Sequence, residues 1–99
     1  MSMSKIIKRL EKELRQQKTD EQQLLNEIAA VSDLEFAEKA AGALNPTTHL
    51  YSFEGYLSLL QMLLSVLMAG MPPDVALDAV QTGWSAERII EYWRFSQNE

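Results

Sequence analysis

The sequence predicts an all-α protein, a small helical bundle of about five helices with a long N-terminal helix. Residues 55–73 form an uncharged run of nineteen residues in a chain that is otherwise densely charged, and such a run has to be buried. Apolar side chains recur at spacings of three and four elsewhere, whereas no segment alternates apolar and polar residues as a strand does. The chain also contains no Asn-Gly or Asp-Gly pair, the commonest marker of a β-hairpin.

Length and charge limit what the protein can be. Ninety-nine residues make one domain, and the absence of cysteine excludes a disulfide framework or a thiolate metal site. The net charge of −5 divides unevenly, because residues 1–18 carry +4 and residues 19–99 carry −9. This asymmetry predicts either pairing between molecules or a basic segment that meets an acidic partner. The charged first residues do not resemble a secretory signal, so we expect a cytoplasmic protein.

Residues 1–31 have the pattern of an amphipathic helix. Gln17 and Glu21 interrupt the apolar positions, so the segment is either one long helix with a polar middle or two helices that meet near Thr19, where Gln22 would complete a capping box. The apolar seam is too long for so short a chain to cover. It therefore predicts that this segment is a dimerisation segment, with the spacing of a coiled coil, and that the protein is a homodimer. The seam residues expected at this interface are Ile7, Leu10, Leu14, Leu24 and Ile28.

Residues 32–99 are expected to form the compact bundle. Ser32 followed by Glu35 has the form of a capping box, with Val31 and Phe36 as a hydrophobic staple, and predicts that a helix starts at Asp33 and continues to about Leu44. One packing line is expected along that helix, made by Ala30, Leu34, Ala37, Ala41 and Leu44.

The central helix is expected to start after Ser52, its cap, and to end at Gly70, with residues 56–68 at the centre of the bundle. Its polar residues are spaced four, three and four apart, which places them on one narrow stripe: Glu54, Ser58, Gln61 and Ser65. A helix that is apolar everywhere else is typical of the centre of a bundle. The polar interruptions and the closing Gly70 and Pro72 disfavour a membrane span, which needs about 20 apolar residues.

The C-terminal part is predicted to be a helix from Pro73 to about Thr82, a break at Gly83, and a last helix capped by Ser85. With Ala79 four residues before Gly83, this pair resembles the helix-turn-helix of DNA-reading domains. That resemblance implies a recognition helix, with Arg88 and Arg94 as the nucleic-acid contacts. Glu87 and Glu91 on the same helix oppose a DNA role, since the phosphate backbone repels carboxylates.

Residues 67–71, 76–80 and 87–93 also look like the three helices of a ubiquitin-associated-type module. The similarity covers under a third of the chain. The connecting turn is about one residue short, and Gly70-Met71-Pro72 replaces the usual Met-Gly-aromatic loop. The resemblance implies a surface that binds a peptide or a protein, and no catalysis.

Residues that could carry chemistry are few. His49 is the only histidine, so neither a zinc site nor a histidine-activated nucleophile has partners, and no glycine-rich phosphate loop is present. No cofactor or metal is therefore expected. Aromatic residues gather near the C-terminus, and we expect them in the core or at an interface, with Trp84 and Trp93 as interaction residues.

These observations favour a non-enzymatic interaction protein: a small adaptor, chaperone-like factor or regulator that acts through helix faces as a homodimer. The alternative is a helix-turn-helix transcriptional regulator.

Overall fold

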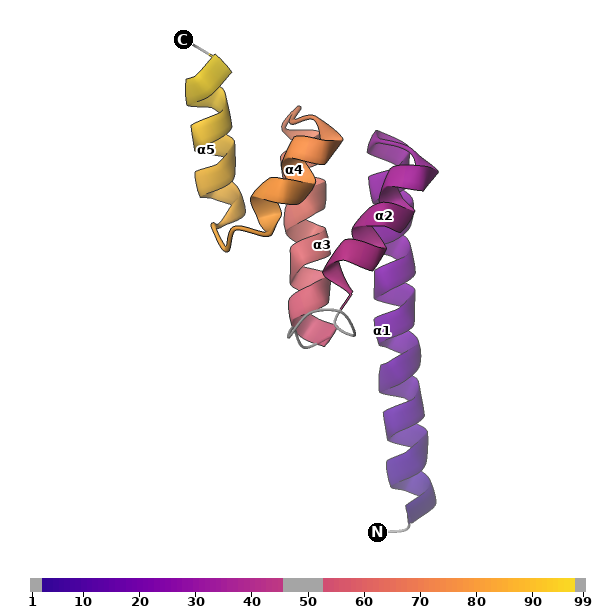
Figure 1. Cartoon of the computed structure of the whole chain (residues 1–99). Helices are drawn as coiled ribbons and strands as arrows, with labels where there is room; N and C mark the ends of the chain where they lie inside the picture. Colours follow the sequence, from indigo (N-terminus) through magenta and orange to yellow (C-terminus); the bar gives the residue numbers. More distant parts are fainter. Residues whose placement is uncertain (1–2, 46–52, 98–99) are drawn as a thin grey trace.

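The computed structural model describes residues 3–45 and 53–97, apart from the side chains of residues 13, 14 and 17. Within these residues the protein is an all-α bundle without strands (Figure 1). The expectations for His49 and for Ser52 as a cap lie outside the described residues. The helices are α1 (Met3–Val31), α2 (Leu34–Leu44), α3 (Phe53–Met68), α4 (Pro73–Val80) and α5 (Ala86–Gln97).

Helix α3 is the centre of the bundle and packs against each of the other four helices. Its polar stripe is exposed along its whole length, as predicted, so Glu54, Ser58, Gln61 and Ser65 face solvent. The other faces of α3 are buried or half-buried, because apolar side chains with 3.6-residue spacing occupy them. Its buried residues are Tyr56, Leu60, Leu63, Val66 and Leu67.

Helix α3 ends where the sequence predicts a stop. Gly70 has a φ of 103°, a left-handed conformation that glycine adopts without a steric penalty. The Gly70 amide donates to the Leu67 carbonyl at 3.0 Å and the Met71 amide donates to the Val66 carbonyl at 3.2 Å. This pair of bonds is a Schellman motif, which turns the chain toward Pro73, the first residue of α4.

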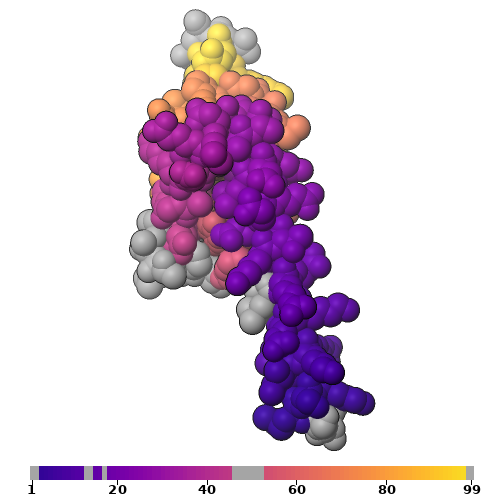
Figure 2. All heavy atoms as spheres, turned by 90° about the vertical axis from the view of Figure 1, so that its right-hand side faces the viewer, coloured from indigo at the N-terminus to yellow at the C-terminus, as the bar shows by residue number. Residues whose placement is uncertain are grey.

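Helix α1 continues through Thr19 without a break. The Thr19 hydroxyl donates to the Arg15 carbonyl at 2.9 Å, one turn back in the same helix, and caps no new one. The second half of α1 packs against α2 and α3, where Ile28 is fully buried. The first half extends beyond the bundle, as Figures 1 and 2 show, and makes the molecule 63 Å long but only 24 Å and 21 Å across.

The predicted cap at Ser32 is wrong by one residue. Asp33 is the cap of α2, because its carboxylate oxygen Oδ1 accepts the Phe36 amide at 2.7 Å. The Ser32 hydroxyl instead donates to the Ile28 carbonyl at 2.5 Å, at the end of α1. Both residue types cap helices well, and the charged acceptor interacts more strongly with the positive helix start. The predicted hydrophobic staple of Val31 and Phe36 depended on that cap and is also wrong, because Val31 is exposed.

The predicted packing line on α2 is also partly wrong. Leu34 is 67% exposed, whereas Phe36, Ala37, Ala40 and Leu44 are buried. Helix α2 contacts both α1 and α3, so it turns its largest side chain, Phe36, toward the core they share. Spacing alone did not distinguish this face from the one that contains Leu34.

Candidate protein-interaction surfaces

The first half of α1 carries an exposed apolar stripe, which we call the α1 tip. Its last three members follow the first by three, four and seven residues, which places all four on one side of the helix. Leu10 is 54% exposed and Ile7 is 49% exposed, although both are large aliphatic side chains. Contiguous exposed apolar surface of this kind commonly marks a contact site. The tip consists of Met3, Ile6, Ile7 and Leu10.

The seam expected from the sequence is divided by the fold. Ile7 and Leu10 are exposed on the projecting half of α1. Leu24 is half-buried and packs against the core, and Ile28 is fully buried within it. Leu14 lies between the two halves, and its side chain is outside the described set. A partner can therefore reach the first half of the seam, while the chain's own α2 and α3 cover the second.

Glu21, which interrupts the seam, lies near Tyr56 on the facing helix α3. Tyr56 is 1% exposed, and its hydroxyl has no hydrogen-bond partner of good geometry in the described part of the chain. Burial raises the pKa of Tyr56 far above its ordinary value, and the Glu21 carboxylate raises it further by favouring the protonated phenol. The polar residue at position 21 is thus explained within one chain.

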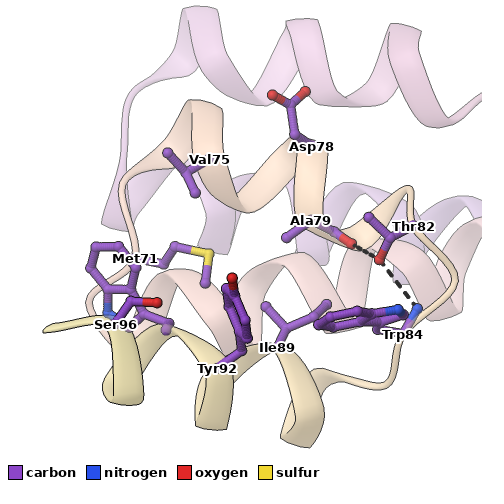
Figure 3. Close-up of a pocket in the computed structure, with 10 residues that line it drawn as sticks. Met71, Val75, Asp78, Ala79, Thr82, Trp84, Ile89, Tyr92 and Ser96 are labelled. Carbon is purple, nitrogen blue, oxygen red and sulfur yellow. Dashed lines mark hydrogen bonds between the residues drawn. The ribbon is translucent and has the colours of Figure 1, made fainter. Parts of the chain in front are cut away.

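A second apolar surface lies between α4 and α5, which diverge from the turn that joins them (Figure 1). The opening between them is a groove of about 480 Å³, within the range of small-ligand pockets. Figure 3 shows Tyr92 rising from α5 between Met71 and Ile89, with Asp78 on the α4 side. The apolar lining comes mainly from Met71, Val75, Ala79, Trp84, Ile89 and Trp93.

The turn between α4 and α5 fixes the position of Trp84. The Thr82 hydroxyl donates to the Ala79 carbonyl at 2.6 Å and accepts the Trp84 amide at 3.3 Å, as Figure 3 shows. Gly83 has a φ of 88°, which side-chain-bearing residues rarely adopt. Ser85 then caps α5, since its hydroxyl accepts the Arg88 amide at 3.2 Å, which confirms the predicted cap.

Aromatic side chains gather at this groove, as the sequence indicates. The rings of Trp84 and Tyr92 meet edge to face, with centroids 5.8 Å apart and planes at 78°. Trp93 is half-buried and also lines the groove. Tyr92 is 62% exposed, because the smaller Ile89 takes the buried position on α5. The exposed rings offer contact area to a partner.

The proposed DNA-contacting residues are both exposed on α5. The Arg88 guanidinium lies over the Trp84 ring, 4.0 Å from its centroid, so it already has a partner within the chain. Arg94 lies in the last turn, where a cation interacts favourably with the helix C-terminus. Glu87 and Glu91 are exposed on the same helix and balance the two arginines.

Comparison with protein families, curated proteins and solved structures finds no match for this chain. The helix-turn-helix and ubiquitin-associated-type resemblances thus gain no support from related proteins. Among the described helices, none combines the length and the hydropathy that crossing a bilayer requires. Residues 3–45 and 53–97 also contain no group of three or more acidic or histidine side chains placed to hold a metal ion.

Proposed function

We propose that this chain is a non-enzymatic interaction protein, an adaptor, chaperone-like factor or regulator, that forms a homodimer through the α1 tip. The observation that carries the proposal is the exposure of Met3, Ile6, Ile7 and Leu10 on a helix half that projects from the bundle. Burial of apolar surface is the main favourable term in most protein association. A partner that covers the tip removes this apolar surface from water.

The electrostatics of the chain favour one arrangement of the two copies. Residues 1–18 hold six basic and two acidic residues, whereas residues 19–99 hold three basic and twelve acidic ones. A parallel coiled coil of two α1 helices would place the two basic ends side by side. An antiparallel or staggered arrangement instead sets each basic end against acidic parts of the partner, and this is the arrangement we propose.

The mass of the protein in solution tests the proposal. Light scattering at micromolar concentration should give about twice the chain mass of 11.2 kDa. The double variant Ile7→Ser, Leu10→Ser should give the mass of one chain while circular dichroism shows unchanged helix content. Leu34→Ser removes a leucine of α2 that is more exposed than Leu10 and should leave the dimer intact. A single-chain mass for the unaltered protein would refute self-association.

The alternative function is DNA binding through α4 and α5. Helix α5 begins at a capped turn and exposes Arg88 and Arg94, which favours this alternative. We rank it second because Glu87 and Glu91 leave the exposed face of α5 without a surplus of positive charge, and affinity for DNA depends on such a surplus.

A further inference from the structure

The α1 tip continues a face of α1 that the bundle covers elsewhere. Leu24 packs against the core and Ile28 is fully buried within it, where α2 and α3 contact the second half of α1. Alternating steps of four and three residues lead from Ile28 back to Leu10 and Ile7, so these residues lie on one side of the helix. The chain's own helices cover this side in the second half of α1, and it is open to a partner in the first half (Figure 1).

The cations of the projecting half-helix lie on its other face. Lys5, Lys8 and Lys12 are all exposed. A rotation of about 100° per residue places them on the side of α1 opposite the tip. A second helix laid along the tip therefore does not approach these ammonium groups. Repulsion between like charges does not oppose a contact between two tips, although the first half of α1 is basic.

The position of the bundle decides the direction of the second helix. In a parallel pair, the second halves of the two α1 helices would face each other on the side where each already carries its own α2 and α3. The two bundles would then occupy the same space. In an antiparallel pair the bundles lie at opposite ends, and each tip meets only the projecting half of its partner (Figures 1 and 2).

We propose that the α1 tip of one copy binds the α1 tip of a second copy as an antiparallel helix pair, with Ile7 of each chain opposite Leu10 of the other. This rests on the proposed function, which assigns self-association to the tip, and it adds the surface that receives the tip and the register of the contact. The same patch of both copies forms the interface, so the dimer has two-fold symmetry and the contact between Ile7 and Leu10 is made twice.

The register follows from which residues the pair brings together. Ile7 is 49% exposed and Leu10 is 54% exposed, so pairing them covers two large aliphatic side chains of each chain. A shift of one heptad toward the partner's bundle would place Ile7 opposite Gln17, a polar residue. The same shift in the other direction would leave only Met3 and Ile7 in the contact. The proposed register therefore buries the most apolar surface of the tip.

The length of the dimer tests its direction. One chain is 63 Å long. Because the tips overlap over about 18 Å of helix, the antiparallel dimer should be about 110 Å long, whereas a parallel pair should be little longer than one chain. Small-angle X-ray scattering measures the maximum dimension at a concentration at which light scattering gives twice the chain mass. A particle of that mass with a maximum dimension close to that of one chain would overturn the antiparallel contact and leave self-association standing.

Disulfide trapping tests the register, since the chain has no cysteine of its own. The variants Ile7→Cys and Leu10→Cys are mixed in equal amounts and oxidised. We expect the cross-linked product to join the two different variants. Either variant alone should cross-link little, because its cysteine is offset from that of its partner by about 4.5 Å along the helix axis and disulfide geometry is strict. The control Leu34→Cys, exposed on α2, should cross-link to Ile7→Cys far less.

The products separate the possible failures. Predominant linkage of Ile7→Cys to itself would show a different register, which overturns the antiparallel pairing of Ile7 with Leu10 but supports the dimer. A dimer that the Ile7→Ser, Leu10→Ser variant dissociates, but that gives no linkage above the Leu34→Cys control, would overturn the contact between tips alone. The light-scattering mass of one chain for the unaltered protein would overturn both proposals.

Discussion

The guanidinium carbon of Arg88 lies 4.0 Å from the centre of the Trp84 ring, so the cation most suited to contact DNA is held against an aromatic face of its own chain. A cation–π contact at an exposed site contributes about 0.5–1 kcal/mol. Trp84 also lines the α4–α5 groove. Arg88 thus packs against one of the residues of this apolar surface.

The Arg88–Trp84 contact leads to a prediction about DNA. We expect no specific binding to a mixed duplex at physiological salt in a mobility-shift experiment. We expect Arg88→Ala to lower the free energy of unfolding by about 1 kcal/mol or less, through the lost contact with Trp84. Arg94→Ala serves as the control that removes the same charge without this contact. Nanomolar, salt-sensitive binding to a defined duplex, strengthened by Glu87→Gln, would instead favour the helix-turn-helix alternative.

The two sides of α3 should respond very differently to truncation. Leu63 is fully buried, so Leu63→Ala should lower the free energy of unfolding by about 2–5 kcal/mol through lost transfer energy and a cavity. Ser65→Ala, on the exposed stripe, should change it by less than about 0.5 kcal/mol. Chemical denaturation followed by circular dichroism measures both. Equal, small effects would show that α3 is not the centre of the core.

The start of α2 provides a test of the cap. Asp33→Ala should cost about 0.5–2 kcal/mol, because the Phe36 amide loses its acceptor. Asp33→Asn keeps an oxygen at the same position and should retain most of the stability. Thermal melts of these variants and of Ser32→Ala compare the two candidate caps. A larger loss for Ser32→Ala than for Asp33→Ala would return the cap to Ser32.

Alkaline pH should destabilise the fold through Tyr56. Its pKa is raised in the folded state from the ordinary value of 10.0, so the folded protein holds this proton more tightly than the unfolded chain does. The stabilisation that this provides is complete below about pH 10 and is lost as the pH rises toward the folded-state pKa. Tyr56→Phe cannot ionise and should reduce this loss, measured as the urea midpoint at pH 8 and pH 11.

Two controls accompany the pH experiment. Glu21→Gln removes the second cause of the raised pKa and should weaken the alkaline loss without abolishing it. At pH 8, Tyr56→Phe should change the stability little, because its buried hydroxyl has no hydrogen-bond partner of good geometry in the described structure. An unchanged alkaline midpoint in Tyr56→Phe would exclude this residue as the source of the pH dependence.

Much of the fold follows from local patterns in the sequence. The exposed stripe of α3 was predictable because polar residues at helical spacing need solvent wherever the helix lies. Gly70 and Ser85 were predictable because a left-handed turn favours glycine and a helix start favours a hydroxyl acceptor. Asp33 was misjudged because Ser32 and Asp33 are adjacent, equally good caps, and the choice depends on where α1 ends.

The candidate surfaces depended on tertiary structure to a greater degree. The sequence indicated the apolar seam and the aromatic cluster but not the groove, because a groove is made by the angle between α4 and α5 and not by either helix. Nothing in the local sequence around Val75 or Met71 indicates that these residues line the groove. Tyr92 comes three residues after Ile89, so helical spacing places both on the same side of α5. Only the packing of α5 decided which of the two is buried.

The sequence by itself determined that the chain is helical, that residues 56–68 need a core, and that its charge separates into a basic start and an acidic remainder. Only the tertiary structure decided that Ile28 is buried while Leu10 is exposed, although both belong to one apolar seam. The physical reason is that helical periodicity depends on neighbours within a turn or two. Burial depends on which other helices reach that part of the seam, and α2 and α3 reach only the second half of α1.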